Sequence, residues 1–210
     1  MSRKLLALCG IIGPISYAIM VVVLGSLWTG YNHVTQSMSE LGAVGAPHAI
    51  YMNTMGFPLL GALLIAFSLG LYRNVRKGKS TKIGCSLIAT SGFALIMTGV
   101  FPCDAGCVDV TNTGTTHSVF ATISALVMMV TPLVLLPALG NDIRWHNYTY
   151  FSLVVGLIVC VLSAVYGFHL VRVDEGLMQR LSMGMALFWI EIMAIKLFTL
   201  SSSGNSGSLA

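Results

Sequence analysis

Charge is what this sequence has least of. Only 9% of its 210 residues are Asp, Glu, Lys or Arg, whereas 56% are hydrophobic. A soluble domain carries about a quarter charged residues, so this chain cannot cover itself with a hydrated surface. Its net charge of +4 comes from basic residues spread over the ends of apolar runs, which argues against a basic face for nucleic acid. The composition predicts an integral membrane protein that has membrane lipid, and no nucleic acid, as its partner.

The sequence also lacks the alternating pattern of β-barrel strands, and an open sheet edge in lipid would leave backbone groups unpaired. It contains instead six apolar runs, each long enough for the roughly 20 residues that cross a hydrocarbon core. We predict an all-α bundle of six transmembrane helices built as three hairpins, forming one domain over residues 1–200. A polar tail, residues 201–210, is predicted to be disordered. The spans are expected at Leu5–Thr29, Tyr51–Tyr72, Ile83–Phe101, His117–Leu139, Tyr150–Leu170 and Leu177–Phe198.

The basic residues predict the orientation of these spans. If the spans alternate in direction, nine of the 11 Lys and Arg residues fall on one side, and only Arg172 and Arg180 fall on the other. By the positive-inside rule both termini then face the cytoplasm. We therefore expect a multi-pass protein of the cell membrane.

Polar side chains gather on the predicted outer side, which holds four of the five histidines. The outer segments are short, so these side chains are expected to meet over the mouth of the bundle. The catalytic candidates are Glu40, Asp104 and His117, and the substrate-binding candidates are Ser39, His169, Gln179 and Arg180. Arg180 lies about one turn into the sixth span and is expected to have a carboxylate partner on energetic grounds, either Glu40 or Asp104.

Several chemistries fit these residue types, and the sequence alone leaves the cofactor unknown. A divalent metal such as zinc could take its ligands from His48, Asp104, His117 and His169, although a local signature such as HExxH is absent. Nucleophilic catalysis could use Ser37 or Ser39 with His117 as base and Asp104 as orienting acid. Haem ligation could use His117 and His169. A purely structural role stays open beside these, because such side chains also cap helices and pair with one another.

Two cysteines lie in the second outer segment. Cys103 and Cys107 are predicted to face an oxidising environment, where they either form a disulfide that stiffens the segment holding Asp104 or remain free thiols. The remaining cysteines fall within spans and are interpreted as packing residues.

Short motifs connect the chain to a known family. They are Ser39-Glu-Leu-Gly42 after the first span, Phe101-Pro-Cys-Asp104 after the third, His117 at the start of the fourth and Gln179-Arg180 at the start of the sixth. Together with six short spans they resemble domain of unknown function 998, a family of small prokaryotic membrane proteins. The resemblance extends to about Phe198 and implies the fold and the membrane location, but no established activity.

A more distant likeness concerns the first outer segment. Ser39-Glu-Leu-Gly42 followed by Pro47 is similar to a serine–acid–x–glycine and proline pattern in eukaryotic six-span proteins. Those proteins include a GPI-anchor lipid-remodelling factor and an autophagy modulator, and they tend to have paired prolines where this chain has Pro47 and His48. The likeness implies handling of lipids at the non-cytoplasmic leaflet.

Our leading hypothesis is a protein that binds or modifies a lipid or amphiphile in a cavity open to the outer leaflet. Arg180 would hold an anionic headgroup, and His117 with Asp104 or Glu40 would perform acid–base work or bind metal. Such an enzyme would be a membrane-embedded hydrolase or a lipid-modifying enzyme. The alternative is a non-enzymatic sensor, assembly factor or complex subunit, acting as a homo-oligomer or with a membrane partner protein. A small transporter comes third and requires Glu191, inside the sixth span, to line a polar path.

Overall fold

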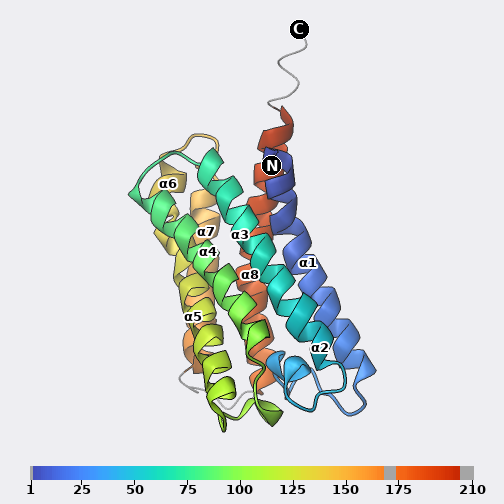
Figure 1. The fold of residues 1–210 in the computed structure, drawn as a ribbon. Helices are drawn as coiled ribbons and strands as arrows, with labels where there is room; N and C mark the ends of the chain where they lie inside the picture. The colour runs from blue at the N-terminus through green and yellow to red at the C-terminus, as the bar shows by residue number, and fades with distance from the viewer. Residues whose placement is uncertain (1, 168–173, 204–210) are drawn as a thin grey trace.

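The computed structural model describes residues 2–167 and 174–203, and it consists of long helices packed side by side (Figure 1). Six helical segments are long and apolar enough to cross a membrane, which confirms the predicted six-span, all-α fold. The elements in chain order are α1 (Arg3–Leu27), the short turn η1 (Ser39–Gly42), α2 (Ala49–Tyr51), the π-helical turn η2 (Met52–Gly56), α3 (Phe57–Asn74), α4 (Lys79–Val100), the short turn η3 (Ala105–Cys107), α5 (Asn112–Val134), α6 (Leu136–Gly140), α7 (Tyr148–Gly167) and α8 (Glu175–Ser203).

Several helices begin before the apolar runs because polar side chains cap their first turns. Thr111 Oγ1 accepts a hydrogen bond from the backbone N–H of Gly114 at 3.1 Å, so α5 starts ahead of His117. The Ser2 hydroxyl likewise accepts from Leu5 N–H at the start of α1. Such caps satisfy donors that a helix leaves free at its N-terminus. At the other end of the chain, α8 continues through Ser203 into the segment predicted to be disordered, and residues 204–210 lie outside the described part.

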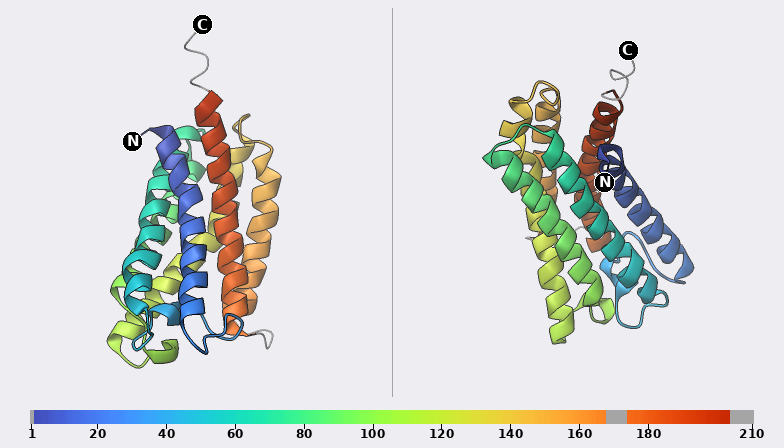
Figure 2. Two further views of the ribbon diagram at one scale, coloured as in Figure 1. Left: turned by 90° about the vertical axis from the view of Figure 1, so that its right-hand side faces the viewer. Right: turned by 45° about the horizontal axis from the view of Figure 1, so that its top comes forward.

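The six spans are arranged as a ring in which each packs against its neighbours in the chain. The second span, ending in α3, lies between α1 and α4, while α5 lies between α4 and α7, and α8 closes the ring by packing on both α7 and α1. Every consecutive pair is in contact, so the packing does not single out three separate hairpins. We call the end of the ring where α1 begins and α8 ends the terminal end, and the opposite end, which carries η1 and η3, the loop end (Figures 1 and 2).

Glycines set the closest helix crossing. On α3 and α4, Gly61 and Gly92 face each other so closely that a methyl group on either would collide with the carbonyl oxygen of the other. Small residues allow this approach of helix backbones, which is the usual device for packing helices in lipid. The α3–α4 pair is therefore in close backbone contact, with Ile65 and Ile96 packed against the two glycines.

Large apolar side chains fill the terminal half of the ring. Phe67 and Leu71 on α3 and Met193 and Leu197 on α8 are fully buried there. Trp189 is also fully buried, and its indole N–H donates to Ser152 Oγ on α7 at 2.9 Å, joining α7 to α8. The core between the helices of this half is consequently filled by side chains.

One carboxylate ties the loops of the terminal end together. Asp142 is buried and accepts hydrogen bonds from the backbone N–H of Arg76 at 2.9 Å and from the guanidinium of Arg144 at 2.7 and 3.0 Å. Arg144 also donates to the carbonyl oxygen of Asn74 at the end of α3. The hydrogen bonds and charge of Arg144 hold the pKa of Asp142 below its usual range.

Candidate functional site

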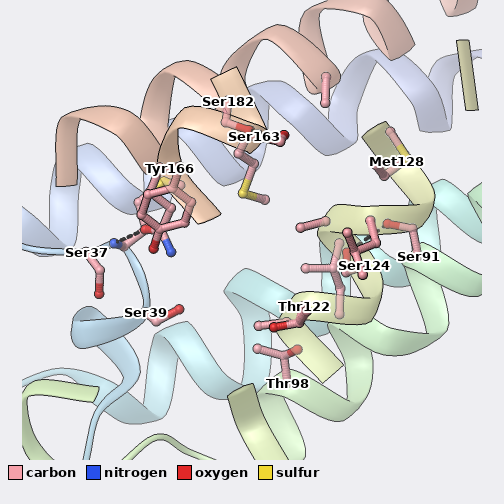
Figure 3. A pocket seen from close by; sticks show the side chains of 18 of the residues that line it. Ser37, Ser39, Ser91, Thr98, Thr122, Ser124, Met128, Ser163, Tyr166 and Ser182 are labelled. Atoms are coloured by element: carbon pink, nitrogen blue, oxygen red, sulfur yellow. Dashed lines mark hydrogen bonds between the residues drawn. The ribbon is translucent and has the colours of Figure 1, made fainter. Parts of the chain in front are cut away.

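A cavity of about 380 Å³ occupies the loop half of the ring, between α5 and α8 (Figure 3). Its volume lies in the range of pockets that hold small-molecule ligands. Along α5 its wall runs from His117 to Met129, which corresponds to a depth of about 18 Å at 1.5 Å per residue. The space extends from the loop end to the middle of the bundle, where the filled half of the ring closes it.

The wall of the cavity is mainly apolar, with hydroxyl groups set into it. Leu64, Met128, Val159 and Leu187 lie in its inner part, and Ser91 and Ser124 lie beside Met128 (Figure 3). The other hydroxyl groups of the wall, also labelled in Figure 3, are those of Ser37, Ser39, Thr98, Thr122, Ser163, Tyr166 and Ser182. A mainly apolar wall that also carries hydroxyl groups suits an amphiphile better than a fully polar ligand.

Pairs of serines join helices across the wall. Ser91 on α4 and Ser124 on α5 are hydrogen bonded at 2.8 Å, and Ser163 on α7 bonds Ser182 on α8 at the same distance. These bonds hold α5 to α4 on one side of the cavity and α7 to α8 on the other. No bond of this kind joins α5 to α7 at that level among the described residues.

Exposed residues of α5 line the cavity on the side that faces α7. The two helices touch toward the terminal end, where Gly156 faces Leu133 and the Cys160 thiol lies 3.8 Å from the carbonyl oxygen of Met129. From there they diverge toward the loop end, as the left view of Figure 2 shows. In the divergent part the α5 residues Ala125 and Leu126 both line the cavity and are exposed. The cavity wall is thus least covered where α5 and α7 diverge.

His117 is a buried polar residue of the cavity wall, with only 2% of its surface exposed. Its Nδ1 lies 2.8 Å from the carbonyl oxygen of Phe101 and 3.1 Å from that of Thr98. Carbonyl oxygens only accept hydrogen bonds, so Nδ1 must carry the proton and Nε2 must be an unprotonated acceptor in the neutral ring. This Nε2 is buried and has no hydrogen-bond partner in the described part of the chain.

Gln179 and Ser39, two of the predicted substrate-binding residues, also line the cavity. Gln179 Oε1 accepts from the backbone N–H of Met38 at 2.6 Å, which attaches the loop before η1 to α8. That bond uses the acceptor of the amide. Its Nε2 donor makes no hydrogen bond with another described residue.

Arg180 was predicted to pair with Glu40 or Asp104, but it has no carboxylate partner among the described residues. Its Nη1 donates to the carbonyl oxygens of Gln36 at 2.8 Å and Gly176 at 2.9 Å. Its Nη2 donates to the hydroxyl of Tyr31 at 2.7 Å and to Nδ1 of His33 at 3.2 Å. Neutral acceptors thus surround the guanidinium, and Arg180 does not line the cavity. It fastens the loop that follows α1 to the first turns of α8.

The two carboxylates of the predicted catalytic set, Asp104 and Glu40, accept hydrogen bonds from residues of their own loops. Asp104 accepts from the backbone N–H groups of Val110 and Thr111 and from the Thr111 hydroxyl, at 2.8 to 3.0 Å. The two backbone N–H groups are the main cause of its lowered pKa. Glu40 accepts from Ser37 N–H and from Gln36 Nε2, each at 2.8 Å. Asp104 does not orient His117, because His117 Nδ1 donates to two backbone carbonyl oxygens instead.

The predicted metal ligands do not assemble in the described residues. No group of three or more His, Cys, Asp or Glu side chains there is placed to hold a metal ion. His48 packs against the ring of Tyr51, with 6.4 Å between ring centroids, and does not line the cavity. His169, assigned to substrate, metal and haem, lies outside the described residues. In the loop beside η3, Cys103 and Cys107 are joined by a disulfide.

Sequence reasoning missed the hydroxyl groups of the wall. The available signal was the spacing on α5, where His117, Ala121, Ser124 and Met128 recur at three- and four-residue intervals and line the cavity, with the small or polar residues Ser118, Thr122 and Ala125 beside them. This spacing marks one face of a helix. Read alone, it is equally typical of helix packing in lipid.

Comparison with known proteins identifies the family but no activity. The family model described as "Protein of unknown function (DUF998)" matches residues 11–196. The chain therefore belongs to this family, as its motifs predicted. No curated protein and no solved structure matches. The likeness to the eukaryotic lipid-remodelling and autophagy proteins stays a prediction.

Proposed function

For this member of the DUF998 family, we propose that the cavity of the loop half binds a membrane amphiphile, which enters between α5 and α7. The supporting observation is the cavity itself, with its mainly apolar wall, the hydroxyl groups set into that wall and the exposed residues Ala125 and Leu126 on its α5 side. An apolar chain in the interior would avoid water, while a polar head would meet the hydroxyl groups. Because nine of the 11 basic residues are expected at the terminal end, we place the cavity toward the outer leaflet.

This proposal is for binding rather than for catalysis. Asp104, Glu40 and Arg180 are engaged in bonds that hold their own loops, and no carboxylate of the described residues is hydrogen bonded to His117. The same bonds favour the second candidate, a non-enzymatic sensor or complex subunit, for which the bound amphiphile would be a signal or a structural component. Transport has less support, because Glu191 does not line the cavity.

The test is to fill the cavity and to measure the lipid retained by the protein. Ala186 on α8 is buried and lines the cavity, so Ala186→Phe places a ring inside it. Gly184→Phe on the same helix is the matched control, because Gly184 is exposed and a side chain there would meet open space. Native mass spectrometry should show a lipid adduct on the wild type and on Gly184→Phe, and its loss from Ala186→Phe. Equal adducts on folded samples of all three proteins would refute the proposal.

A further inference from the structure

The polar groups at the mouth of the cavity form an incomplete hydrogen-bonding set. His117 offers only an acceptor, Nε2, because its Nδ1 proton is held by the carbonyl groups of Thr98 and Phe101. Gln179 offers only a donor, its Nε2, because its carbonyl oxygen accepts from Met38 N–H. Besides the hydroxyl groups of the wall, the imidazole thus offers one acceptor and the amide one donor to an occupant. A hydroxyl group can donate to the imidazole acceptor and still accept from a donor of the wall.

The charges of the described residues at the mouth, which exclude 168–173, argue against an anionic head. No lysine or arginine lines the cavity in the described ranges, and the charged side chain that does so is the acidic Glu175. The sequence assigned Arg180 to an anionic headgroup. Both of its terminal nitrogens instead donate hydrogen bonds within the protein, to Tyr31, His33, Gln36 and Gly176. An anion placed beside the unprotonated His117 Nε2 would meet a lone pair instead of a donor, and its charge would be poorly compensated.

A cationic head also fits poorly. Glu175 is exposed at the start of α8, where water screens its charge. Deeper in the cavity the polar groups are neutral hydroxyl, amide and imidazole groups. A buried ammonium group would therefore lack a buried counter-charge.

We infer that the occupant is an electrically neutral amphiphile with a free hydroxyl group, such as a diacylglycerol or a long-chain alcohol, whose hydroxyl donates to His117 Nε2. This inference rests on the proposed function, since it names the class of lipid for the same cavity. The hydroxyl sits at the loop end between α5 and α8. The apolar chain follows the inner wall and leaves between α5 and α7.

The experiment compares three lipids with the same acyl chains. The protein is reconstituted in dioleoylphosphatidylcholine nanodiscs that contain equal fractions of 1,2-dioleoylglycerol, its 3-acetyl ester or dioleoylphosphatidic acid. The lipid retained on the protein is then measured by native mass spectrometry. The wild type should retain dioleoylglycerol over both others by roughly three- to tenfold, the factor that one hydrogen bond supplies.

Two histidine variants assign this preference to a residue. His117→Asn keeps an amide N–H in place of Nδ1–H and removes the Nε2 acceptor, so it should lose the preference for the free hydroxyl over the acetyl ester. His48→Asn, outside the cavity wall, should keep that preference. Thermal unfolding shows that each variant is folded before its lipids are compared.

The possible outcomes separate this inference from the proposed function. Equal or greater retention of phosphatidic acid or of the acetyl ester, lost in Ala186→Phe, would overturn the hydroxyl assignment while the cavity still binds amphiphile. Unchanged preference in His117→Asn would also overturn it. If Ala186→Phe retains every lipid as the wild type does, the cavity does not bind the lipid. That result would refute both the proposed binding function and the inference that rests on it.

Discussion

The guanidinium of Arg180 on α8 donates a hydrogen bond to the hydroxyl of Tyr31, just beyond α1, at 2.7 Å. The Tyr31 hydroxyl in turn donates to the carbonyl oxygen of Ser37 at 2.8 Å. This chain of bonds fixes the segment whose next residues, Met38 and Ser39, cover the loop end of the cavity. Arg180 thus acts on the cavity through the loop, without lining the cavity itself.

We expect Arg180→Lys to release this loop. A lysine has a single nitrogen and cannot reproduce bonds that diverge from two nitrogens to four acceptors. The variant should lose about 2–3 kcal/mol of stability, the scale of a buried hydrogen bond from a charged group. Amide hydrogen exchange of residues 31–39 should rise in the same variant.

Lys79→Gln provides the control for Arg180→Lys, because Lys79 is exposed at the opposite end of the bundle. It should leave both stability and exchange of the loop unchanged. Exchange that stays at the wild-type rate in Arg180→Lys would contradict the fastening role.

His33 should make the stability of the loop end depend on pH. Its Nδ1 accepts from Arg180, and burial together with the positive charge of Arg180 lowers the pKa of His33 below its ordinary value. The folded protein then binds fewer protons than the unfolded chain once the pH falls below about 6.5. This stability is fully present above that pH and is lost as the pH falls through the lowered pKa.

The measurement is the melting temperature between pH 8 and pH 5, for the wild type and for His33→Gln, which keeps an acceptor but does not titrate. The variant should show a smaller decrease at acid pH. His146→Gln removes a histidine of the terminal end, whose Nδ1 lies 3.0 Å from a carbonyl oxygen instead of a guanidinium, and should leave the decrease at the wild-type size. Equal decreases in wild type and His33→Gln would show that His33 does not cause it.

Asp142→Asn should weaken the terminal end. The carboxylate accepts from Arg144 and from the backbone of Arg76, and an amide can replace one of its oxygens but repels the donor that faces its NH₂ group. We expect a loss of about 1–3 kcal/mol. Because the pKa of Asp142 is lowered, its contribution is present above about pH 3.9 and is lost as the pH falls through the lower, folded-state pKa.

Chemical unfolding of Asp142→Asn in detergent at pH 7 and pH 3 checks this prediction. The difference from the wild type should be largest at pH 7 and should shrink at pH 3, where the wild-type carboxylate begins to take up protons as well. Asp109→Asn serves as control, because Asp109 is exposed and bonds only Ser118 within the described part. If the stability difference between Asp142→Asn and the wild type were larger at pH 3 than at pH 7, the carboxylate would not stabilise the fold in its ionised form, contrary to this prediction.

Part of the candidate site was accessible to sequence reasoning because it is local. The bonds from Asp104 to Val110 and Thr111 span only six and seven residues, and an aspartate in such a loop commonly orders a turn. The alternative of a structural carboxylate was therefore open from the sequence. His117, Ser39 and Gln179 were singled out as well, and all three line the cavity.

The partners of Arg180 were beyond sequence reasoning because they lie far away in the chain. Gln36 is 144 residues from Arg180, and Tyr31 is 149 residues away. An energetic rule states that an arginine in a span needs compensation, but it does not say whether a carboxylate or several neutral acceptors will provide it. The geometry of α1 against α8 decided in favour of neutral acceptors.

The sequence by itself determined the six spans and their family, because the length of an apolar run and the need to pair every backbone group in lipid leave a helix as the solution. Only the tertiary structure decided where an empty volume remains. The terminal half of the ring is filled by large side chains such as Phe67 and Trp189, whereas α5 diverges from α7 in the loop half. A cavity is the difference between the space that helices enclose and the volume that side chains fill, and no single span contains that information.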